Sequence, residues 1–373
     1  MVEVKEMKTG KEIEDFIRFK FNLMHDYPYW VPPLIREQKE LFDPRKNPAY
    51  QQADAWLFMA YRDGRPVGRI AVIINRLEVE DQKKSKIRFG WFDVVDDVQV
   101  ARKLLQKVSK IGRENGLSYM EGPVGFTNMD KAGMLIKGFE ELGTMITWYN
   151  PSYYPEIMNQ LEFKKEKEWV EYKIKIPTGG PSEKVEKFAR LVLERHELHV
   201  VNFDDKRQIM ERADEMFELI NHTYSGLSTF TPIKAEQVDY YKSKYFRYLH
   251  PDFISCVADK DDKLVAFAIT MPSFARALQK ARGRLFPLGW FHLMKARYFN
   301  DRAAFYLIGI RPEYQNKGIT ATIFKEMNEL FNRRGITEVE TNPELEENKA
   351  VQALWNRYEH EQHKRRCTYR KEL

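Results

Sequence analysis

One order of strands and helices occurs twice along the chain, and this repetition constrains its fold more than any other feature of the sequence. In the first half, the strand patterns Trp56–Tyr61 and Pro66–Asn75 flank Asp63-Gly64, a dipeptide typical of a tight hairpin turn. A third strand pattern, Gly90–Val95, precedes Val98–Glu114, whose apolar residues recur every three or four positions as on an amphipathic helix. Strands followed by a helix in this order predict an α/β fold.

The second half repeats this order with different residues. Asp205–Tyr224 predicts a helix, and Phe253–Val257 and Lys263–Met271 predict strands that pair around Asp261-Asp262. Four further patterns complete the half: the strand Ala304–Ile310, the helix Ile319–Arg333, the strand Thr337–Thr341 and the helix Asn348–Tyr358. We therefore expect an α/β fold with a mixed sheet, built from one plan used twice.

A cluster of turn-forming residues separates the halves. Pro177–Ser182 lies between the strand pattern Trp169–Ile176 and the helical pattern Glu183–Glu197. At 373 residues the chain is longer than one hydrophobic core usually supports. We predict two domains, residues 1–178 and residues 179–373.

Composition narrows the class of protein. Hydrophobic residues make up 43% of the chain and charged residues 31%, as in soluble globular proteins. Lys and Arg number 61 against 55 Asp and Glu, and the net charge of +6 is too small to indicate a nucleic-acid partner. Cys256 and Cys367 have no metal-ligand spacing around them, so we expect no metal and a reducing compartment. The start has no apolar signal core and no stretch nears the roughly 20 apolar residues that span a bilayer, so we expect a cytoplasmic protein.

A strand, a polar loop and the start of a helix follow one another at residues 305–320. The apolar strand Phe305–Ile310 leads into the loop, and Gln315–Thr320 stands where the helix begins. The free N–H groups and positive dipole end of a helix N-terminus suit a pyrophosphate. Gly318 would let the backbone approach that phosphate without a Cβ in the way.

This stretch resembles the acyl-CoA loop of the GNAT acyltransferase superfamily, Gln/Arg-x-x-Gly-x-Gly/Ala. Gln315 and Gly318 match the pattern, whereas Thr320 stands where Gly or Ala is usual. A second motif, from Val339–Asn342 to Asn348–Trp355, is similar to the family's fifth strand and to the Asn-x-x-Ala helix along the pantetheine. The resemblance implies acyl-CoA or acetyl-CoA as co-substrate. The residues that it would place around this donor are Ile308, Gly309, Ile310, Gln315, Asn316, Lys317, Gly318, Ile319, Thr320 and Asn348.

Other interpretations of these motifs stay open. The loop could be an ordinary strand-to-helix turn and Asn348 an ordinary helix cap. A GNAT fold could also have lost catalysis and serve as an acyl-CoA sensor. A tandem-GNAT aminoacyl transferase would use aminoacyl-tRNA as its donor instead. The presence of the phosphate loop argues against that donor.

The first half resembles the family more weakly, because it lacks the phosphate loop. Val94–Val98 occupies the equivalent place and carries Asp96 and Asp97, whose charges would repel a pyrophosphate. We therefore interpret residues 1–178 as a degenerate GNAT-like domain that shapes the acceptor site. Its glycine-rich loop Gly122–Asn128 could line that site or could be a tight connection alone. The candidate acceptor-lining residues are Asn128, Lys131, His222, Tyr224 and Trp290.

Over nearly its full length the chain resembles a group of bacterial tandem-GNAT proteins. The segments that carry this likeness are Trp30–Leu34, Gly64–Ile70, Gly122-Pro123 and Gly283–Trp290. Some members are understood as N-acyltransferases that make bacterial ceramide from a sphingoid base. The resemblance implies an acyl donor and an amine acceptor, with a long-chain amphiphilic amine as one candidate.

Residues 263–300 contain seven Lys and Arg residues and no Asp or Glu. The segment also holds large apolar side chains, and Trp290, Phe291 and Met294 share one arc of a helix that would start near Pro287. One interpretation is a segment that lies on an anionic membrane and makes the protein peripheral at the inner membrane face. One alternative is a packed helix that closes the core between the halves. Another is a nucleic-acid surface, which also combines basic and aromatic residues but which the modest net charge disfavours.

The sequence offers three candidate catalytic residues. Attack of an amine on a thioester needs one proton removed and one supplied, and Glu340 on the fifth strand is the first candidate for the base. Where the family commonly has Tyr as general acid, this chain has Trp355, so Tyr358 or Tyr306 would have to substitute. The patterns leave the acceptor, the acyl-chain length, the choice between CoA and a carrier protein as donor, and the oligomeric state open.

Overall fold

The computed structural model describes residues 1–127, 129–226 and 230–373. Residues 1–178, the N-terminal half, contain four α-helices: α1 (Gly10–Leu23), α2 (Ile35–Leu41), α3 (Val98–Glu114) and α4 (Tyr153–Gln160). The strands of this half are β1 (Val2–Glu6), β2 (Ala53–Arg62), β3 (Arg65–Asn75), β4 (Lys86–Val94), β5 (Tyr119–Gly122), β6 (Met134–Lys137) and β7 (Lys164–Lys175). The predicted hairpin is confirmed, since β2 and β3 pair around Asp63 and Gly64, both with positive φ.

Residues 179–373, the C-terminal half, follow the same order. Its helices are α5 (Glu183–His196), α6 (Lys206–Glu211), α7 (Ala213–Tyr224), α8 (Ala235–Tyr245), α9 (Ala275–Ala281), α10 (Gly289–Tyr298), α11 (Ile319–Arg334) and α12 (Lys349–Gln352). Its strands are β8 (His199–Val201), β9 (Ile254–Ala258), β10 (Leu264–Pro272), β11 (Arg302–Ile310), β12 (Glu338–Thr341), β13 (Glu344–Leu345) and β14 (His360–Glu372).

Two predicted helices differ from those observed. The helix expected over Asp205–Tyr224 is divided at Arg212, whose backbone leaves helical geometry between α6 and α7. The helix expected over Asn348–Tyr358 keeps only the single turn α12, followed by a short 3-10 turn at Trp355–Arg357. The Trp355 ring is buried there and packs edge-on against Phe305 of β11, 5.3 Å between ring centroids.

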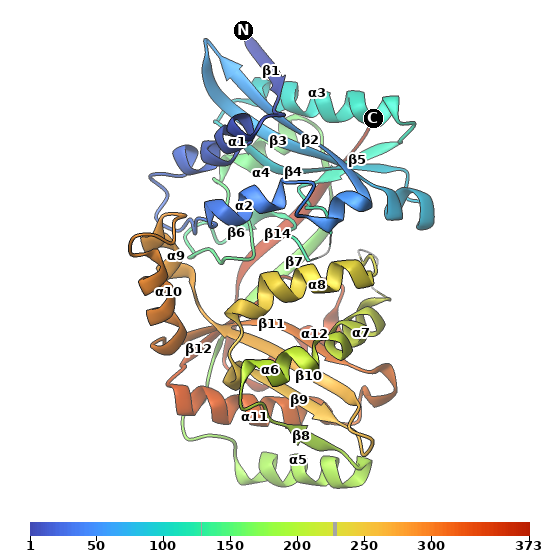
Figure 1. The fold of residues 1–373 in the computed structure, drawn as a ribbon, viewed down its shortest axis with the longest axis vertical. Coiled ribbons are helices and arrows are strands. Elements are labelled where there is room, and N and C mark those ends of the chain that lie inside the picture. The colour runs from blue at the N-terminus through green and yellow to red at the C-terminus, as the bar shows by residue number, and fades with distance from the viewer. Residues whose placement is uncertain (128, 227–229) are drawn as a thin grey trace.

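All the main strands form one mixed sheet, in the order β1-β2-β3-β4-β5-β14-β7-β12-β11-β10-β9-β8. The order is symmetric about its centre, where each half gives its last strand to the other. β14 pairs with β5 of the N-terminal half, and β7 pairs with β12 of the C-terminal half. Figure 1 shows β14 running from the lower half of the molecule up to β5. The mixed α/β fold is as expected, and this exchange joins the halves through backbone hydrogen bonds.

Each half contains one parallel strand pair with a helix as its crossover. β4 pairs with β5 across α3, and β11 pairs with β12 across α11. On α3, Val100, Leu104 and Val108 are buried against the sheet, which is the apolar face that the sequence pattern predicts.

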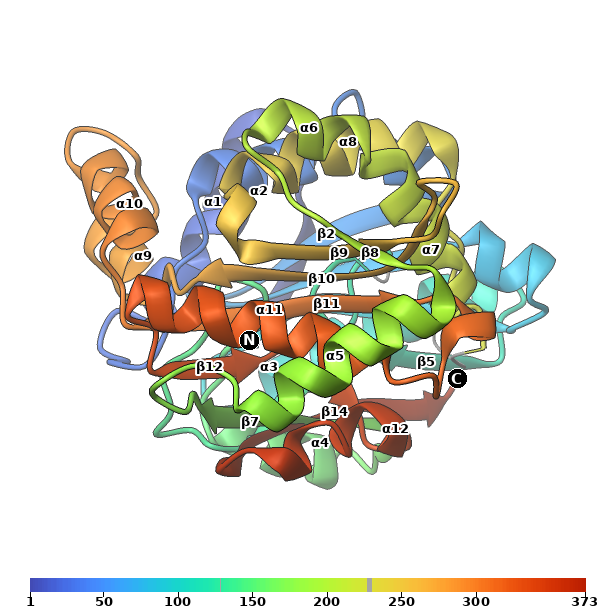
Figure 2. The same ribbon diagram turned by 90° about the horizontal axis from the view of Figure 1, so that it is seen from below.

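Helices α9 and α10 stand apart from these layers. They occupy the connection between β10 and β11 and project from the side of the molecule (Figure 2). In the described part of the chain, no helix combines the length and the apolar character needed to cross a bilayer.

Candidate active site

The turn before α11 leaves the start of that helix without a side-chain cap. Gly318 occupies the capping position with φ of 84°, a left-handed conformation that favours glycine. A Cβ there would come within 3.0 Å of Phe188 and Val192 on α5. Gln315, Asn316 and Lys317 are exposed, and the Gln315 side chain donates to the Ile310 carbonyl at 3.2 Å. The first-turn amides of α11 can therefore serve an anion.

In the equivalent turn before α3, a carboxylate occupies the first amides of the helix. Asp97 caps the helix by accepting hydrogen bonds from the amides of Gln99 at 2.8 Å and Val100 at 3.4 Å. Arg62 pairs with the same side chain at 2.5 Å. Burial acts to raise the pKa of Asp97, but Arg62 and the two amides outweigh it and lower that pKa, so the group is ionised at neutral pH.

Strands β11 and β12 diverge in the middle of the C-terminal half. Their pairing ends at Phe305 and Thr341, while β11 continues to Ile310. The register between β10 and β11 shifts at this point, so that Tyr306 is the extra residue of a β-bulge. Asn342 spans the opening of the gap, because its side-chain amide donates to the Tyr306 carbonyl at 2.7 Å.

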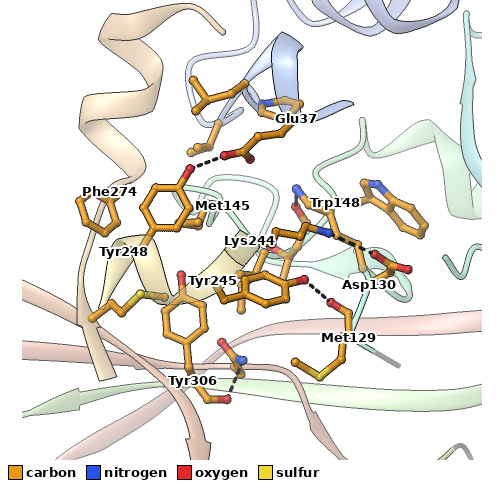
Figure 3. Close-up of a pocket in the computed structure, with 18 of the residues that line it drawn as sticks. Glu37, Met129, Asp130, Met145, Trp148, Lys244, Tyr245, Tyr248, Phe274 and Tyr306 are labelled. Carbon is orange, nitrogen blue, oxygen red and sulfur yellow. Dashed lines mark hydrogen bonds and ion pairs between the residues drawn. The ribbon is translucent and has the colours of Figure 1, made fainter. Parts of the chain in front are cut away.

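A cavity of about 320 Å³ lies between the two halves and reaches this gap. Tyr306, Leu307, Asn342 and Pro343 form its wall beside the diverging strands. Figure 3 shows the Tyr306 ring pointing from β11 into the cavity toward Tyr245 and Tyr248. No residue that the structure describes is a hydrogen-bond partner of the Tyr306 hydroxyl, and burial raises the pKa of that hydroxyl far above its usual value.

One end of the cavity is apolar and belongs mainly to the C-terminal half. Its lining residues come from α7, β10 and the α9–α10 hairpin: Met216, Phe217, Ile220, Ile269, Met271, Phe274, Leu278 and Leu293. Leu293 lies on α10, so the apolar lining continues into the projecting hairpin. This end can accommodate a hydrocarbon chain.

The charged side chains of the lining come mainly from the N-terminal half. Lys20 and Arg69 both pair with Asp93, and Arg69 does so at 2.7 Å. Glu37 of α2 accepts a hydrogen bond from the Tyr248 hydroxyl, which ties the N-terminal half to the segment after α8 (Figure 3). Sequence analysis missed these groups, although a charged residue within the apolar strand pattern at Arg69 was a visible sign.

The glycine-rich loop after β5 forms part of the cavity wall. Residues Met129 to Ala132 line the cavity, and α8 of the other half holds the loop in place. The Tyr245 hydroxyl donates to the Met129 carbonyl at 2.8 Å, and Lys244 lies 3.7 Å from Asp130. Lys131 thus lies in the cavity wall, whereas Asn128 falls outside the described residues.

The remaining acceptor-lining candidates do not line the cavity. The Tyr224 hydroxyl donates to the Ile308 carbonyl at 2.8 Å, and burial raises the pKa of Tyr224 to about 12. His222 is exposed, with Nδ1 3.0 Å from the Glu218 carbonyl. Trp290 is 49% exposed on α10.

Two of the three catalytic candidates also lie away from the cavity lining. Burial acts to raise the pKa of Glu340, but Lys364 and His363 overcome this and hold it at about 2. A carboxylate with that pKa is a weak proton acceptor. Tyr358 packs against Phe324 of α11, 6.0 Å between ring centroids, and burial raises its pKa. Asn348 accepts from the Val351 amide at 3.5 Å as the cap of α12.

Within residues 1–127, 129–226 and 230–373, no group of three or more His, Cys, Asp or Glu side chains is arranged to hold a metal ion.

Comparison with known proteins identifies the domain that surrounds the diverging strands. Residues 213–359 match the model of the acetyltransferase (GNAT) family. The protein YghO of Escherichia coli (strain K12) is 26% identical, and the match covers 99% of this chain and 95% of that protein. The bacterial ceramide synthase of Caulobacter vibrioides (strain NA1000 / CB15N) is 23% identical, over 92% of this chain and 91% of that protein.

Solved structures share the fold over the whole chain. A tandem GNAT protein from the clavulanic acid biosynthesis pathway superposes with a TM-score of 0.57 at 10% identity, covering 100% of this chain and 98% of that one. A GCN5-related N-acetyltransferase from Sphaerobacter thermophilus gives a TM-score of 0.54 at 11% identity, with coverage of 100% and 95%. The predicted repetition of one plan in both halves therefore corresponds to a tandem GNAT fold.

Proposed function

We propose that this chain is a tandem-GNAT acyltransferase that transfers an acyl group from acyl-CoA to the amine of a long-chain amphiphile such as a sphingoid base. The observation that carries the proposal is the cavity between the halves. It joins the gap between β11 and β12, where the family binds its donor, to an apolar chamber lined by both halves. The likeness to the Caulobacter ceramide synthase supports the same class of acceptor.

The donor site in this proposal is the C-terminal half alone. The loop Gln315–Thr320 would hold the pyrophosphate, because Gly318 starts α11 in a left-handed conformation and leaves the helix without a side-chain cap. The backbone of Ile308–Ile310 and the side chain of Asn348 would hold the pantetheine arm. Beyond Phe305, β11 no longer pairs with β12, and backbone N–H groups along this edge would polarise the thioester carbonyl.

The acceptor would lie across the cavity with its chain at the apolar end and its amine near Tyr306. Chain burial supplies binding free energy of about 25 cal/mol per Å² of apolar surface. Among the proposed proton donors, Tyr306 is the one in the cavity wall. Its hydroxyl is protonated at neutral pH, and because burial raises its pKa it is a weaker acid than an ordinary tyrosine, which suits a relay that gains one proton as it gives up another. It is the first candidate to protonate the departing thiolate.

The α9–α10 hairpin supports a membrane source for the acceptor. Several of its apolar side chains face solvent, with Phe286 77% exposed, Phe291 51% and Phe299 78%. Arg276, Lys280, Arg282, Arg284 and Lys295 are exposed around them, without an acidic residue in the segment. Basic and apolar groups together favour an anionic bilayer surface. A lipid amine could then pass along α10 toward Leu293 in the cavity wall.

Turnover with purified protein tests the proposal. We expect free thiol release from acyl-CoA in the presence of sphinganine, a smaller rate with butylamine, and an N-acyl product by mass spectrometry. Acetyl-CoA and palmitoyl-CoA in parallel define the acyl chain. If calorimetry detects acyl-CoA binding but no amine yields product, the protein is a sensor and the proposal is wrong. Acyl transfer from aminoacyl-tRNA but not from acyl-CoA would contradict it as well.

A further inference from the structure

Four cationic side chains line the cavity, and one of them differs from the other three. Lys20 and Arg69 share Asp93, and Lys244 pairs with Asp130. Among the residues that the structure describes, Lys131 has no carboxylate partner, and its Nζ donates to the Thr147 carbonyl at 3.1 Å. Lys131 is partly buried, and an ammonium that has lost part of its hydration without gaining a carboxylate partner is destabilised relative to the neutral amine.

Charged groups from several elements face this side chain. Lys20 comes from α1, Arg366 from β14 and Lys244 from α8, while Glu37 of α2 is the acid that acts in the opposite direction. Arg366 is itself held by Glu171 of β7. Burial is the largest influence and these cations add to it, so that the pKa of Lys131 falls to about 7.

On the basis of the acyltransferase function proposed above, we propose that Lys131 is the general base that takes a proton from the ammonium group of the acceptor in the cavity. Other acids and bases of the site are less suited. Glu340 lies outside the cavity lining and is paired with Lys364, and Asp130 and Glu37 already serve Lys244 and Tyr248. Alkyl amines are mostly protonated at neutral pH and cannot attack until that proton is removed.

The proton balance of the reaction is complete with this assignment. Lys131 takes one proton from the acceptor, and the neutral amine attacks the thioester carbonyl carbon. A C–N bond forms, the C–S bond breaks, and the sulfur carries away the electron pair as thiolate. The second amine proton passes to this thiolate, with Tyr306 as the candidate relay, and Lys131 releases its own proton to solvent before the next turnover.

A pair of acceptors separates base catalysis from a structural role. Dodecylamine must lose a proton before it reacts, whereas O-dodecylhydroxylamine has the same chain length and is already neutral at pH 7. We expect Lys131→Met to lower kcat/KM for dodecylamine by about 100-fold or more, the usual size of a lost general base, and to change the hydroxylamine rate little. Lys131→Arg should behave similarly, because a guanidinium stays protonated. Lys137→Met, at an exposed lysine nearby, is the matched control and should match wild type on both acceptors.

The pH profile gives a second readout. With dodecylamine, wild-type kcat/KM should rise as the pH passes about 7, because Lys131 is active in its neutral form, and Lys131→Met should lose this step. Equal losses on both acceptors would overturn the inference. If wild type acylates neither acceptor, the proposed function fails and the inference with it. If Lys131→Met does not fold, a lysine NMR titration of the wild type decides: Lys131 must titrate near pH 7, and ordinary titration near pH 10 would overturn the role.

Discussion

The first turns of α3 and α11 occupy equivalent places in the two halves. They differ in the residue that caps the helix at the positive end of its dipole. In the N-terminal half the Asp97 carboxylate takes the amides of Gln99 and Val100. In the C-terminal half Gly318 has no side chain, and the turn before α11 is longer and exposed. One fold can thus offer or withhold an anion site through the residue that caps a single helix.

The second difference is the segment that connects the third and fourth strands of each half. Residues 76–85 join β3 to β4 and include one short helical segment at Leu77–Asp81. The corresponding connection between β10 and β11 carries α9 and α10, with their exposed aromatic and basic side chains. The C-terminal half thus holds the proposed donor site and membrane contact, while the N-terminal half supplies most of the charged side chains in the cavity lining.

Gly318→Glu tests the first difference and should have the largest effect. A carboxylate at this position would repel the pyrophosphate, and we expect acyl-CoA affinity to fall at least about 1,000-fold, or about 4 kcal/mol. Calorimetric titration measures the affinity. Gly335→Glu at the other end of α11 controls for the added charge and for a positive φ, here 68°, and Gly318→Ala controls for the contact of a new Cβ with Phe188 and Val192. Unchanged affinity in Gly318→Glu would show that the donor site is elsewhere.

The sequence predicted the elements whose signals are local. Helices α3 and α11 follow from apolar periodicity, and the two hairpins follow from Asp63-Gly64 and Asp261-Asp262. The exchange of β7 and β14 was not predicted, because their partners lie far away in sequence and local pattern carries no information on pairing across such distances.

Part of the candidate site was also predictable, because some of its residues lie in local sequence patterns. The loop before α11 has a local pattern, and Lys131 lies in a loop whose glycines are visible in the sequence. Glu340 and Tyr358 were candidates by position along the chain, but the direction of a side chain from a strand or turn depends on how far β12 diverges from β11. Lys20, Arg69 and Tyr248 are far apart in the sequence and come together only in the folded chain, where all three line the cavity.

Charge reversal in the hairpin tests the second difference and should have an intermediate effect. Each base near an anionic surface contributes about 1 kcal/mol, so Arg282→Glu, Arg284→Glu and Lys295→Glu together should weaken binding to anionic vesicles by about 100-fold or more. Flotation with phosphatidylglycerol vesicles measures this, and raised salt should act in the same direction. Charge reversal at Arg102, Lys103 and Lys110 on α3 of the N-terminal half is the control. If the wild-type protein does not bind anionic vesicles, the proposed membrane contact is wrong.

Asp97→Ala should have the smallest effect and sharpens the comparison between the helix starts. Loss of the cap should lower the free energy of unfolding by about 1 kcal/mol at pH 7, without creating a second acyl-CoA site. The folded pKa of Asp97 is lowered, so its contribution exists above the unfolded pKa and is lost as the pH falls through the folded pKa. Urea unfolding at pH 7 and pH 3 should therefore show a difference from wild type that shrinks in acid. Asp96→Ala, at an exposed neighbour, serves as control, and an equal loss there would contradict a capping role for Asp97.

The central claim is that two halves of one fold make a single donor site, and the stoichiometry of acyl-CoA binding tests it most directly. Isothermal titration of the wild-type chain with a non-hydrolysable acyl-CoA thioether should give one site per chain, and the same titration of Gly318→Glu should give none. Two equivalent sites in the wild type, or one site retained in Gly318→Glu, would contradict the account.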